Sequence, residues 1–340
     1  MQVVDQFTGQ SHTVRGSCVV NCTGAWANEV LQLGSSQRPQ RRTRSEGVHL
    51  ITSKIQIQSA VVLQIESGEH LMLLPWRGLT IIGPTDRPFE GSPSQYRPTR
   101  ASVDELIDKI NRSIPAIKMS GEFTRQDILF HFGGLRPLVD VDLHDETYSA
   151  SRRYEIVDHQ ERDGLSGLVS VEGGKYTTSR GLAEATLALI AKRAKWNVHR
   201  TDTKRYVLHS CRVGTYKKFL ESMIAHYGKS YPMQTIEYYV RNYGLDASRV
   251  LDIGLQTSDG RIELTPDGEI MAEVDHVLEE ELVYTLSDIL LRRTGIGWVG
   301  CPKASLLQTI AAKLGDKLNW TKQQQQQAID GFIDQHYTLP

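Results

Sequence analysis

The 340-residue sequence lacks long hydrophobic runs, an excess of one charge and a dense set of cysteines. Without a run of about 20 apolar residues, no membrane-spanning helix is expected. The 39 basic and 40 acidic residues nearly cancel, which gives no reason to expect a nucleic acid as partner. Four scattered cysteines are too few for a disulfide framework and favour a reducing, cytoplasmic setting. No charged and then apolar leader opens the chain, so no signal peptide is expected.

Two of the cysteines, Cys18 and Cys22, would face the same side of an expected strand. A metal pair is one interpretation, but the sequence offers no second pair to complete a site. Two small buried residues are therefore the preferred interpretation, and no metal site is predicted.

The most informative stretch is L-S-G-L-V-S-V-E-G-G-K-Y-T-T-S-R, residues 165–180. Its apolar run 168–171 predicts a strand, which ends at two glycines (173–174). Either threonine of 177–178 could cap a helix over 181–193. A helix N-terminus beside two residues without side chains can receive an anion or a flat, electron-rich ring. An ordinary βα turn without a ligand is the alternative, because short glycine motifs alone are weakly specific.

A second strand-to-helix turn comes near the N-terminus. S-C-V-V-N-C (17–22) predicts a strand, T-G-A-W (23–26) a turn, and residues 27–33 a helix. Gly24 would allow the backbone of the turn to approach a nucleotide closely. A tight turn without a ligand is again the alternative.

The middle of the chain has the pattern of an antiparallel sheet. Short apolar runs punctuated by glycine predict strands over 60–64, 71–76 and 79–83. A helix over 102–114 and a strand over 124–132 follow.

From residue 216 onward helical patterns dominate. Six helices are expected, over 216–227, 235–243, 247–255, 279–293, 304–314 and 321–337.

Five motifs occur in a fixed order, namely N-C-T-G-A-W (21–26), I-I-G-P-T-D (81–86), G-G-L-R-P-L (133–138), S-R (151–152) and G-G-K-Y-T-T (173–178). Together they resemble the FAD-dependent glycerol-3-phosphate dehydrogenases, which belong to the D-amino-acid oxidase-like flavoproteins. The resemblance implies FAD as cofactor and oxidation of sn-glycerol 3-phosphate to dihydroxyacetone phosphate, with electrons passed on to a quinone. No G-x-G-x-x-G stands near the start, so we expect a fragment that lacks the N-terminal segment of that family.

The resemblance also implies an α/β plus α fold in four segments. Residues 1–40 would form part of a Rossmann-like FAD-binding domain, and 161–200 its closing βα unit. Residues 41–160 would form an antiparallel-sheet substrate domain, and 205–340 an all-helical C-terminal domain.

Single residues receive roles from the same resemblance. The cofactor would be bound by Thr23, Gly24, Trp26, Gly173, Gly174, Lys175, Tyr176 and Thr177. A cation at Lys175 would stabilise negative charge on the reduced flavin, or it would reach the substrate; both roles stay open.

Arg136 and Arg152 match the substrate-binding arginines of the family. A planar guanidinium offers two aligned donors to an oxyanion, and two such groups favour a phosphate ester over a single carboxylate. His49 matches a histidine of the family that is catalytic or lies at the flavin edge, and imidazole suits proton removal from an alcohol near neutral pH; Arg136 would share the catalytic site. A structural histidine and an exposed loop arginine are the alternatives.

Three alternatives to this function stay open. The first is a glycerol-3-phosphate oxidase, which uses oxygen as acceptor. The second is an amino-acid oxidase relative, against which the paired arginines and the helical domain argue. The third is a non-catalytic fragment that cannot hold FAD alone. A peripheral contact with the inner face of the cytoplasmic membrane and a homodimer also stay open.

Overall fold

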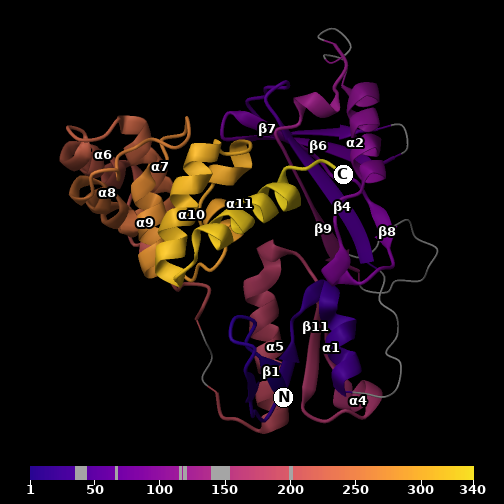
Figure 1. Ribbon diagram of the computed structural model, residues 1–340. Coiled ribbons are helices and arrows are strands. Elements are labelled where there is room, and N and C mark those ends of the chain that lie inside the picture. The colour runs from indigo at the N-terminus through magenta and orange to yellow at the C-terminus, as the bar shows by residue number, and fades with distance from the viewer. Residues whose placement is uncertain (35–43, 66–67, 115–116, 118–120, 139–153, 199–201) are drawn as a thin grey trace. The chain divides into compact units, whose positions relative to one another are not determined.

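The computed structural model describes residues 1–34, 44–65, 68–114, 117, 121–138, 154–198 and 202–340 (Figure 1). Packing divides the chain into two units. The first comprises Met1–Gly47, Thr85–Arg97 and Gly133–Thr203, and the second Val48–Pro84, Pro98–Phe132 and Lys204–Pro340. The combination of strands with a helical C-terminal part confirms the predicted α/β plus α fold class.

The first unit is organised around two parallel strands, β3 (Val19–Asn21) and β11 (Leu168–Gly173). Their register places Asn21 beside Ser170. Strand β10 (Tyr154–Asp158) runs antiparallel along the other edge of β11. The unit also contains the short strands β1 (Gln2–Val4), β2 (Ser11–Thr13) and β8 (Arg87–Phe89).

Each parallel strand leads into a helix. After β3 the chain passes through a 3-10 turn (Gly24–Trp26) into α1 (Ala27–Gly34). After β11 it passes through a second 3-10 turn (Tyr176–Thr178) into α5 (Ser179–Ala194). Both predicted strand–turn–helix units are therefore present. The short helix α4 (His159–Asp163) connects β10 to β11.

Two local predictions for this unit are wrong. Strand β3 is shorter than expected, and Cys18 and Cys22 lie just outside it, with Cys22 exposed rather than buried. Thr178 occupies the N-cap position of α5, but its hydroxyl donates to the Lys175 carbonyl at 2.9 Å instead of accepting a helix N–H. A local turn bond thus replaces the expected cap.

The second unit contains an antiparallel sheet of β5 (Val61–Gln64), β6 (His70–Trp76), β7 (Leu79–Gly83) and the end of β4 (Arg44–Thr52). Strands β5, β6 and β7 agree with the runs predicted from the sequence. Strand β4, and β9 (Phe130–Pro137) that pairs with it, continue along the chain from one unit to the other.

Helix α2 (Arg100–Ser113) packs on this sheet. It begins where the Thr99 hydroxyl accepts the Ser102 N–H at 3.1 Å, an N-cap bond that satisfies one of the free donors of the first turn. The shared core consists of Val48, Leu50, Leu71, Leu73, Ile82, Val103, Leu106, Ile110, Ile114, Ile117 and Phe123.

The strand predicted over 124–132 is only partly formed. Residues Arg125–Asp127 make a 3-10 turn, and β9 begins at Phe130. The Asp127 carboxylate accepts the Thr124 N–H at 2.7 Å, and such a local bond favours a turn over a strand. Strand β9 extends further than predicted, so Arg136 lies on a strand and not in a loop.

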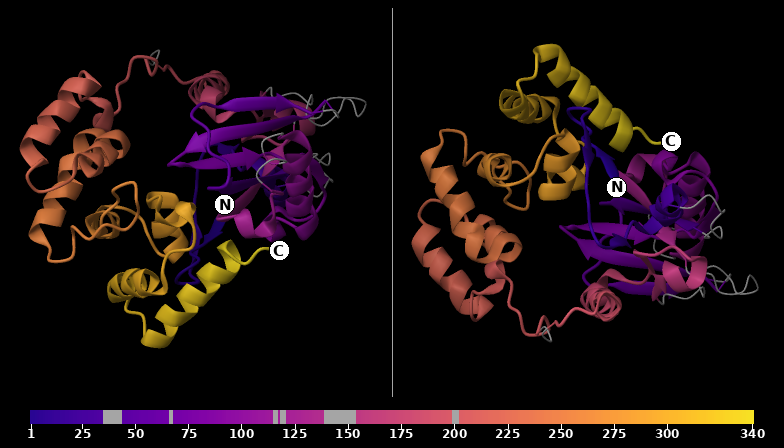
Figure 2. Two further views of the ribbon diagram at one scale, coloured as in Figure 1. Left: turned by 90° about the horizontal axis from the view of Figure 1, so that it is seen from above. Right: turned by 90° about the horizontal axis from the view of Figure 1, so that it is seen from below.

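From residue 216 onward the second unit is mainly helical, as predicted. The helices are α6 (Tyr216–Tyr227), α7 (Met233–Tyr243), α8 (Ala247–Gln256), α9 (Met271–Glu280), α10 (Ala304–Leu318) and α11 (Lys322–His336). Both views in Figure 2 show α6 to α8 gathered in one group and α10 and α11 in another. Among the described residues, no helix combines the length and apolar character needed to cross a bilayer.

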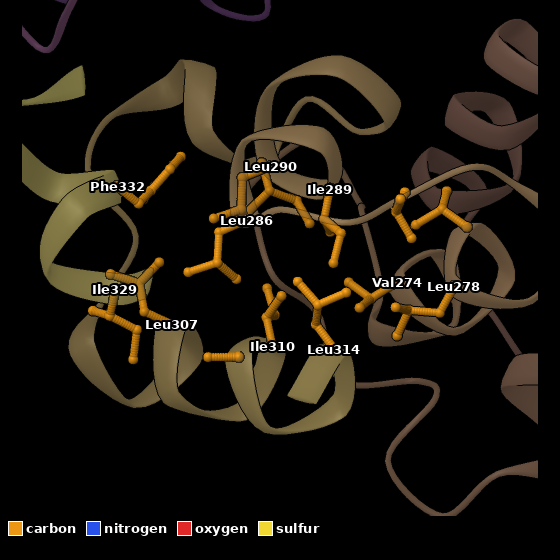
Figure 3. Close-up of a cluster of buried hydrophobic side chains, with 14 of the residues drawn as sticks. Val274, Leu278, Leu286, Ile289, Leu290, Leu307, Ile310, Leu314, Ile329 and Phe332 are labelled. Carbon is orange, nitrogen blue, oxygen red and sulfur yellow. The ribbon is translucent and has the colours of Figure 1, made fainter. Parts of the chain in front are cut away.

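Two separate hydrophobic clusters hold these helices. One lies among α6, α7 and α8 around Ile236, Tyr239 and Leu251. The other is drawn in Figure 3, where side chains from α9, α10, α11 and the segment around Leu290 point toward one another, with Ile310 among them.

The single helix predicted over 279–293 is wrong. Helix α9 ends at Glu280, and a separate π-helical turn covers Asp288–Arg293. The Asp288 carboxylate accepts the backbone N–H groups of Tyr284 and Thr285, at 3.1 and 2.9 Å. These bonds start a new turn, which periodicity alone does not reveal.

Arg77, at the tip of the β6–β7 hairpin, joins the antiparallel sheet of the second unit to the helical part of the same unit. Arg77 has a φ of 54°, and its guanidinium forms ion pairs with Asp267 and Glu269. It also donates to the Gly295 carbonyl at 2.6 Å. Several donors in one planar group suit such a junction, where one side chain binds several separate chain segments.

Two buried carboxylates, those of Glu269 and Glu273, lie near Arg77. Glu269 accepts hydrogen bonds from Arg77 and from the Tyr238 hydroxyl, the latter at 2.6 Å. Glu273 accepts the Tyr243 hydroxyl at 2.7 Å and is 1% exposed. Burial, together with the nearby charge of Glu269, raises the pKa of Glu273 from 4.5 to about 8.

This pKa predicts a pH-dependent stability. Between about pH 4.5 and 8 the folded chain holds a proton on Glu273 that the unfolded chain has lost. The free energy of unfolding should therefore fall as the pH rises, by up to about 1.4 kcal/mol per pH unit from this group. Glu273→Gln should remove that slope, because glutamine resembles the protonated acid. Urea unfolding at pH 5.5 and 8.5 measures it.

Glu280→Gln, on an exposed position of the same helix, is the control and should keep the wild-type pH dependence. An unchanged slope in Glu273→Gln would show that Glu273 is ionised in the folded chain over this range.

Candidate cofactor site

The two turns predicted to bind the cofactor belong to neighbouring strands. The first turn (23–26) follows β3 and the second turn (173–177) ends and follows β11. Because these strands are parallel, their carboxyl ends lie at the same edge of the sheet. Ligands of open α/β sheets bind at this edge, so the fold brings the two predicted turns together where a nucleotide would bind.

Gly24 fixes the shape of the first turn. Its φ is +57°, and a Cβ placed on it would meet no described atom within 4 Å. The sequence suggested that glycine is needed here because the backbone approaches a nucleotide closely. Among the described atoms a Cβ would have space, so the left-handed φ is what favours glycine at this position. Trp26 is exposed, and its ring N–H donates to the Ser94 hydroxyl at 2.9 Å.

The second turn presents its residues to the surface. Gly173 and Gly174 have φ of 65° and 87°. A Cβ on Gly174 would lie 3.3 Å from the Tyr154 Cβ, so both conformation and space favour glycine. Lys175, Tyr176 and Thr177 are exposed, and Tyr176 fully so, which leaves them accessible to a ligand.

A small pocket of about 10 Å³ lies in the same unit, lined by Gly24, Ala25, Ala27, Asn28, Arg44, Pro137, Leu138 and Glu172. The Asn28 side-chain oxygen lies buried in this lining without a hydrogen-bond partner among the described residues. A buried polar atom of this kind fits a site completed by a polar ligand. This volume is about that of one water molecule, so the buried Asn28 oxygen, and not the size of the pocket, is what suggests a polar ligand.

Arg44 forms one wall of the pocket and is itself firmly held. Its guanidinium pairs with Glu29 at 2.9 Å and donates to the Ala25 carbonyl at 2.6 Å. The arginine thus ties strand β4 to the first turn and to α1.

Arg136 lies on β9 in the first unit and is about one third exposed. It pairs with Asp86 at 3.2 Å and donates to the Ser45 hydroxyl at 3.0 Å and to the Thr85 carbonyl at 3.2 Å. A Cβ on Gly47 would lie 2.6 Å from its Cζ, so the guanidinium packs directly on that glycine. The side chain is fixed in place, as a group that orients a substrate must be.

His49 lies on β4 in the second unit. Its ring stacks on Phe132, with centroids 4.9 Å apart and planes 5° from parallel. The ring also packs against Gly83, where an added Cβ would lie 2.6 Å from the ring Cδ2. Stacking on an aromatic ring beside a glycine restricts the imidazole to one orientation. Arg152, the second predicted substrate arginine, lies outside the described residues.

Three candidate residues were missed by the reasoning from sequence, namely Asn28, Arg44 and Tyr96. Burial and the charge of Glu46 raise the pKa of Tyr96 far above its usual range, while Arg136 opposes this shift. Asn28 is one of several polar residues on its helix, and Tyr96 lies in a loop. No local pattern distinguishes either from solvated neighbours.

Residues 295–300, G-I-G-W-V-G, match the dinucleotide fingerprint that is absent near the start. They form a 3-10 turn (Ile296–Val299) between helices and follow no strand. Without the strand–turn–helix context the letters alone do not form a phosphate cradle.

Comparisons with known proteins agree with this geometry. Residues 2–189 match the FAD dependent oxidoreductase family, and residues 201–325 match the C-terminal domain of alpha-glycerophosphate oxidase. A glycerol-3-phosphate dehydrogenase of Synechocystis sp. is 28% identical over 96% of this chain and 60% of its own length. An aerobic glycerol-3-phosphate dehydrogenase of Staphylococcus haemolyticus is 27% identical over 96% of this chain and 58% of its own.

Among solved structures, the glycerol-3-phosphate dehydrogenase from Bacillus halodurans complexed with FAD superposes with a TM-score of 0.79 at 23% identity. The superposition covers 98% of this chain and 64% of that one, and it shows that the fold is shared. The chain thus spans about 60% of the length of these relatives. Since the first family covers more than half of the residues, this chain belongs to the FAD-dependent oxidoreductases.

Proposed function

We propose that this chain takes part in the FAD-dependent oxidation of sn-glycerol 3-phosphate to dihydroxyacetone phosphate, with the electrons passed on to a quinone. Bound FAD supplies the acceptor for a hydride, which no amino-acid side chain provides. Because quinones are membrane lipids, the proposal places the chain in the cytoplasm, in peripheral contact with the inner face of the membrane.

One observation carries the proposal. The two turns at the carboxyl ends of β3 and β11 share one edge of a parallel pair, beside a pocket that contains the buried Asn28 oxygen. Gly24 and Gly173 shape the turns, and the helices α1 and α5 begin directly after them. Helix N-termini favour negatively charged groups, which suits the phosphates or the reduced ring of FAD.

The substrate roles follow from the chemistry of the side chains. Arg136 would bind the substrate oxyanion through its fixed guanidinium, and Arg152 would supply the second charge that a phosphate dianion favours. His49 would take the hydroxyl proton as hydride leaves the same carbon. Lys175, exposed at the second turn, would stabilise negative charge on the cofactor or reach the substrate.

The visible spectrum of the purified chain with added FAD tests the proposal. We expect a bound flavin band after removal of free FAD, and bleaching of that band under anaerobic conditions by sn-glycerol 3-phosphate. Glycerol, which lacks the phosphate, is the matched control and should leave the band unchanged.

Each other result supports a different alternative. If no flavin is retained, the chain is a non-catalytic fragment when isolated. If glycine or sarcosine bleaches the band and sn-glycerol 3-phosphate does not, the chain acts as an amino-acid oxidase relative.

Arg136→Lys separates substrate binding from cofactor binding. Lysine keeps the charge but loses the planar fork, so half-maximal flavin reduction should require roughly 10- to 100-fold more sn-glycerol 3-phosphate. The affinity for FAD should stay within about twofold of wild type. Rapid-mixing absorbance under anaerobic conditions gives the first quantity, and flavin fluorescence gives the second.

Arg241→Lys is the control, since Arg241 is exposed and pairs with Glu237 on α7. If Arg136→Lys lowers the stability in urea and leaves the substrate dependence of flavin reduction unchanged, Arg136 has only a structural role through its bonds to Asp86 and Thr85.

Oxygen is the second candidate acceptor, because the matched C-terminal family is described from alpha-glycerophosphate oxidase. The reduced flavin should reoxidise faster with a soluble quinone than with air-saturated buffer. Faster reoxidation in air, with hydrogen peroxide formed in equal amount, would identify an oxidase instead.

A further inference from the structure

A chain of buried polar groups in the first unit connects a surface carboxylate to the first turn. His159, at the start of α4, and Ser170, in the middle of β11, are fully buried, and Asn21, at the end of β3, is 1% exposed. Asp163, at the end of α4, is about one third exposed. None of these residues has a role in the function proposed above.

The contacts run without interruption from one end to the other. Asp163 contacts the His159 Nδ1, and the His159 Nε2 lies 2.7 Å from the Ser170 hydroxyl oxygen. That oxygen lies 3.2 Å from the Asn21 Nδ2, and the Asn21 Oδ1 lies 2.6 Å from the Thr23 hydroxyl. The last residue belongs to the first turn.

With His159 neutral, the donors and acceptors have one consistent arrangement. The Asn21 oxygen must accept the Thr23 N–H, and its amide nitrogen must donate to the Ala27 carbonyl at 3.0 Å, so the amide cannot be flipped. The same nitrogen then donates to Ser170, whose own proton is left for His159 Nε2.

The contacts at the Asp163 end lead to the same assignment of donors and acceptors. The His159 hydrogen bond and the Arg162 guanidinium lower the pKa of Asp163, so that its carboxylate accepts. His159 Nδ1 must therefore carry a proton, and in the neutral imidazole this leaves Nε2 to accept from Ser170. Arg162 also lies 3.4 Å from Nδ1, but as a donor it could bond there only in the opposite tautomer, at a long distance.

A serine, a histidine and an aspartate linked in this order resemble a hydrolytic triad. Ser170 is fully buried between two paired strands and its hydroxyl already contacts Asn21 and His159. No substrate carbonyl can reach it, so nucleophilic chemistry is excluded. What the chain of bonds can do is fix the amide of Asn21.

Asn21 connects these hydrogen bonds to the candidate cofactor site. Its amide binds both Thr23, the first residue of the turn, and Ala27, the residue after the turn, with hydrogen bonds at 2.6 and 3.0 Å. Gly24, Ala25, Ala27 and Asn28 line the pocket beside the turn. The position of the amide therefore sets the position of the pocket wall.

We propose that His159 is a positioning residue for the cofactor site: held in its Nδ1–H tautomer by Asp163, it orients Ser170 and Asn21 and thereby the first turn. The effect on FAD rests on the proposed function, whereas the effect on the turn does not. The two are measured separately.

The test uses the full chain and the variants Asp163→Ala, Ser170→Ala and their combination. Asp163→Ala removes the acceptor at the surface end, and Ser170→Ala interrupts the chain of bonds. Glu161→Ala is the control, because it removes a carboxylate from the same helix without contact to His159. Asp163→Asn keeps an acceptor oxygen and should restore most of the lost effect.

The first measurement is made without FAD. The ¹⁵N resonances of the His159 ring, assigned by comparison with His159→Gln, should show a protonated Nδ1 and an unprotonated Nε2. Amide hydrogen exchange at Thr23 should be about 3- to 10-fold faster in Asp163→Ala and in Ser170→Ala, as expected for the loss of one supporting hydrogen bond.

The second measurement is the FAD dissociation constant from flavin fluorescence. It should rise about 3- to 10-fold in each single variant and by no more in the combination, because both act through one path. Glu161→Ala should stay within about twofold of wild type.

Four results would overturn the proposal: a protonated Nε2, unchanged Thr23 exchange, fully additive effects in the combined variant, or equal binding of FAD by wild type and variants. If the wild-type chain binds no FAD, the proposed function fails, and the tautomer and the Thr23 exchange still decide the role of His159. If wild type and variants bind FAD equally, the role of His159 fails and the proposed function stands.

Discussion

The pairing of β3 with β11 is the interaction on which the candidate cofactor site depends. Asn21 and Ser170 are neighbours in this pair, although 149 positions separate them in the sequence. Parallel strands cannot be joined by a tight turn, so a long connection must separate them. In return, the parallel arrangement places both carboxyl ends, and with them both glycine turns, at one edge of the sheet. An antiparallel pair would have placed the turns at opposite edges.

The same pairing explains why polar residues are buried in the first unit. Asn21 and Ser170 lie inside a sheet, where an unpaired amide or hydroxyl would cost roughly 1–3 kcal/mol. Each is satisfied by the other and by a further partner, Ala27 for Asn21 and His159 for Ser170. A buried network in which every member is bonded rigidifies its surroundings. The apolar clusters of the second unit provide stability without this kind of directional constraint.

Periodicity and glycine spacing were enough to predict most strands, most helices and both turns, because these signals are local. Two of the errors occur where a carboxylate binds nearby backbone N–H groups. Asp127 converts the start of an expected strand into a turn, and Asp288 divides an expected helix. A carboxylate that starts a turn has the same letter as one that faces solvent, so the pattern of apolar residues does not separate the two.

The candidate site was predictable to the extent that its residues belong to motifs. Residues that meet only through the fold, such as Asn28 and His159, have no such signal, because their burial is decided by strands distant in sequence. Glycine illustrates the difference. The sequence linked it to a nucleotide, yet Gly47 lies against the Arg136 guanidinium in the first unit, and Gly83 against the His49 ring in the second. A side chain at either position would displace a residue proposed to act on the substrate. These two glycines are therefore best understood as the space into which the substrate residues pack, a role that only the tertiary structure reveals.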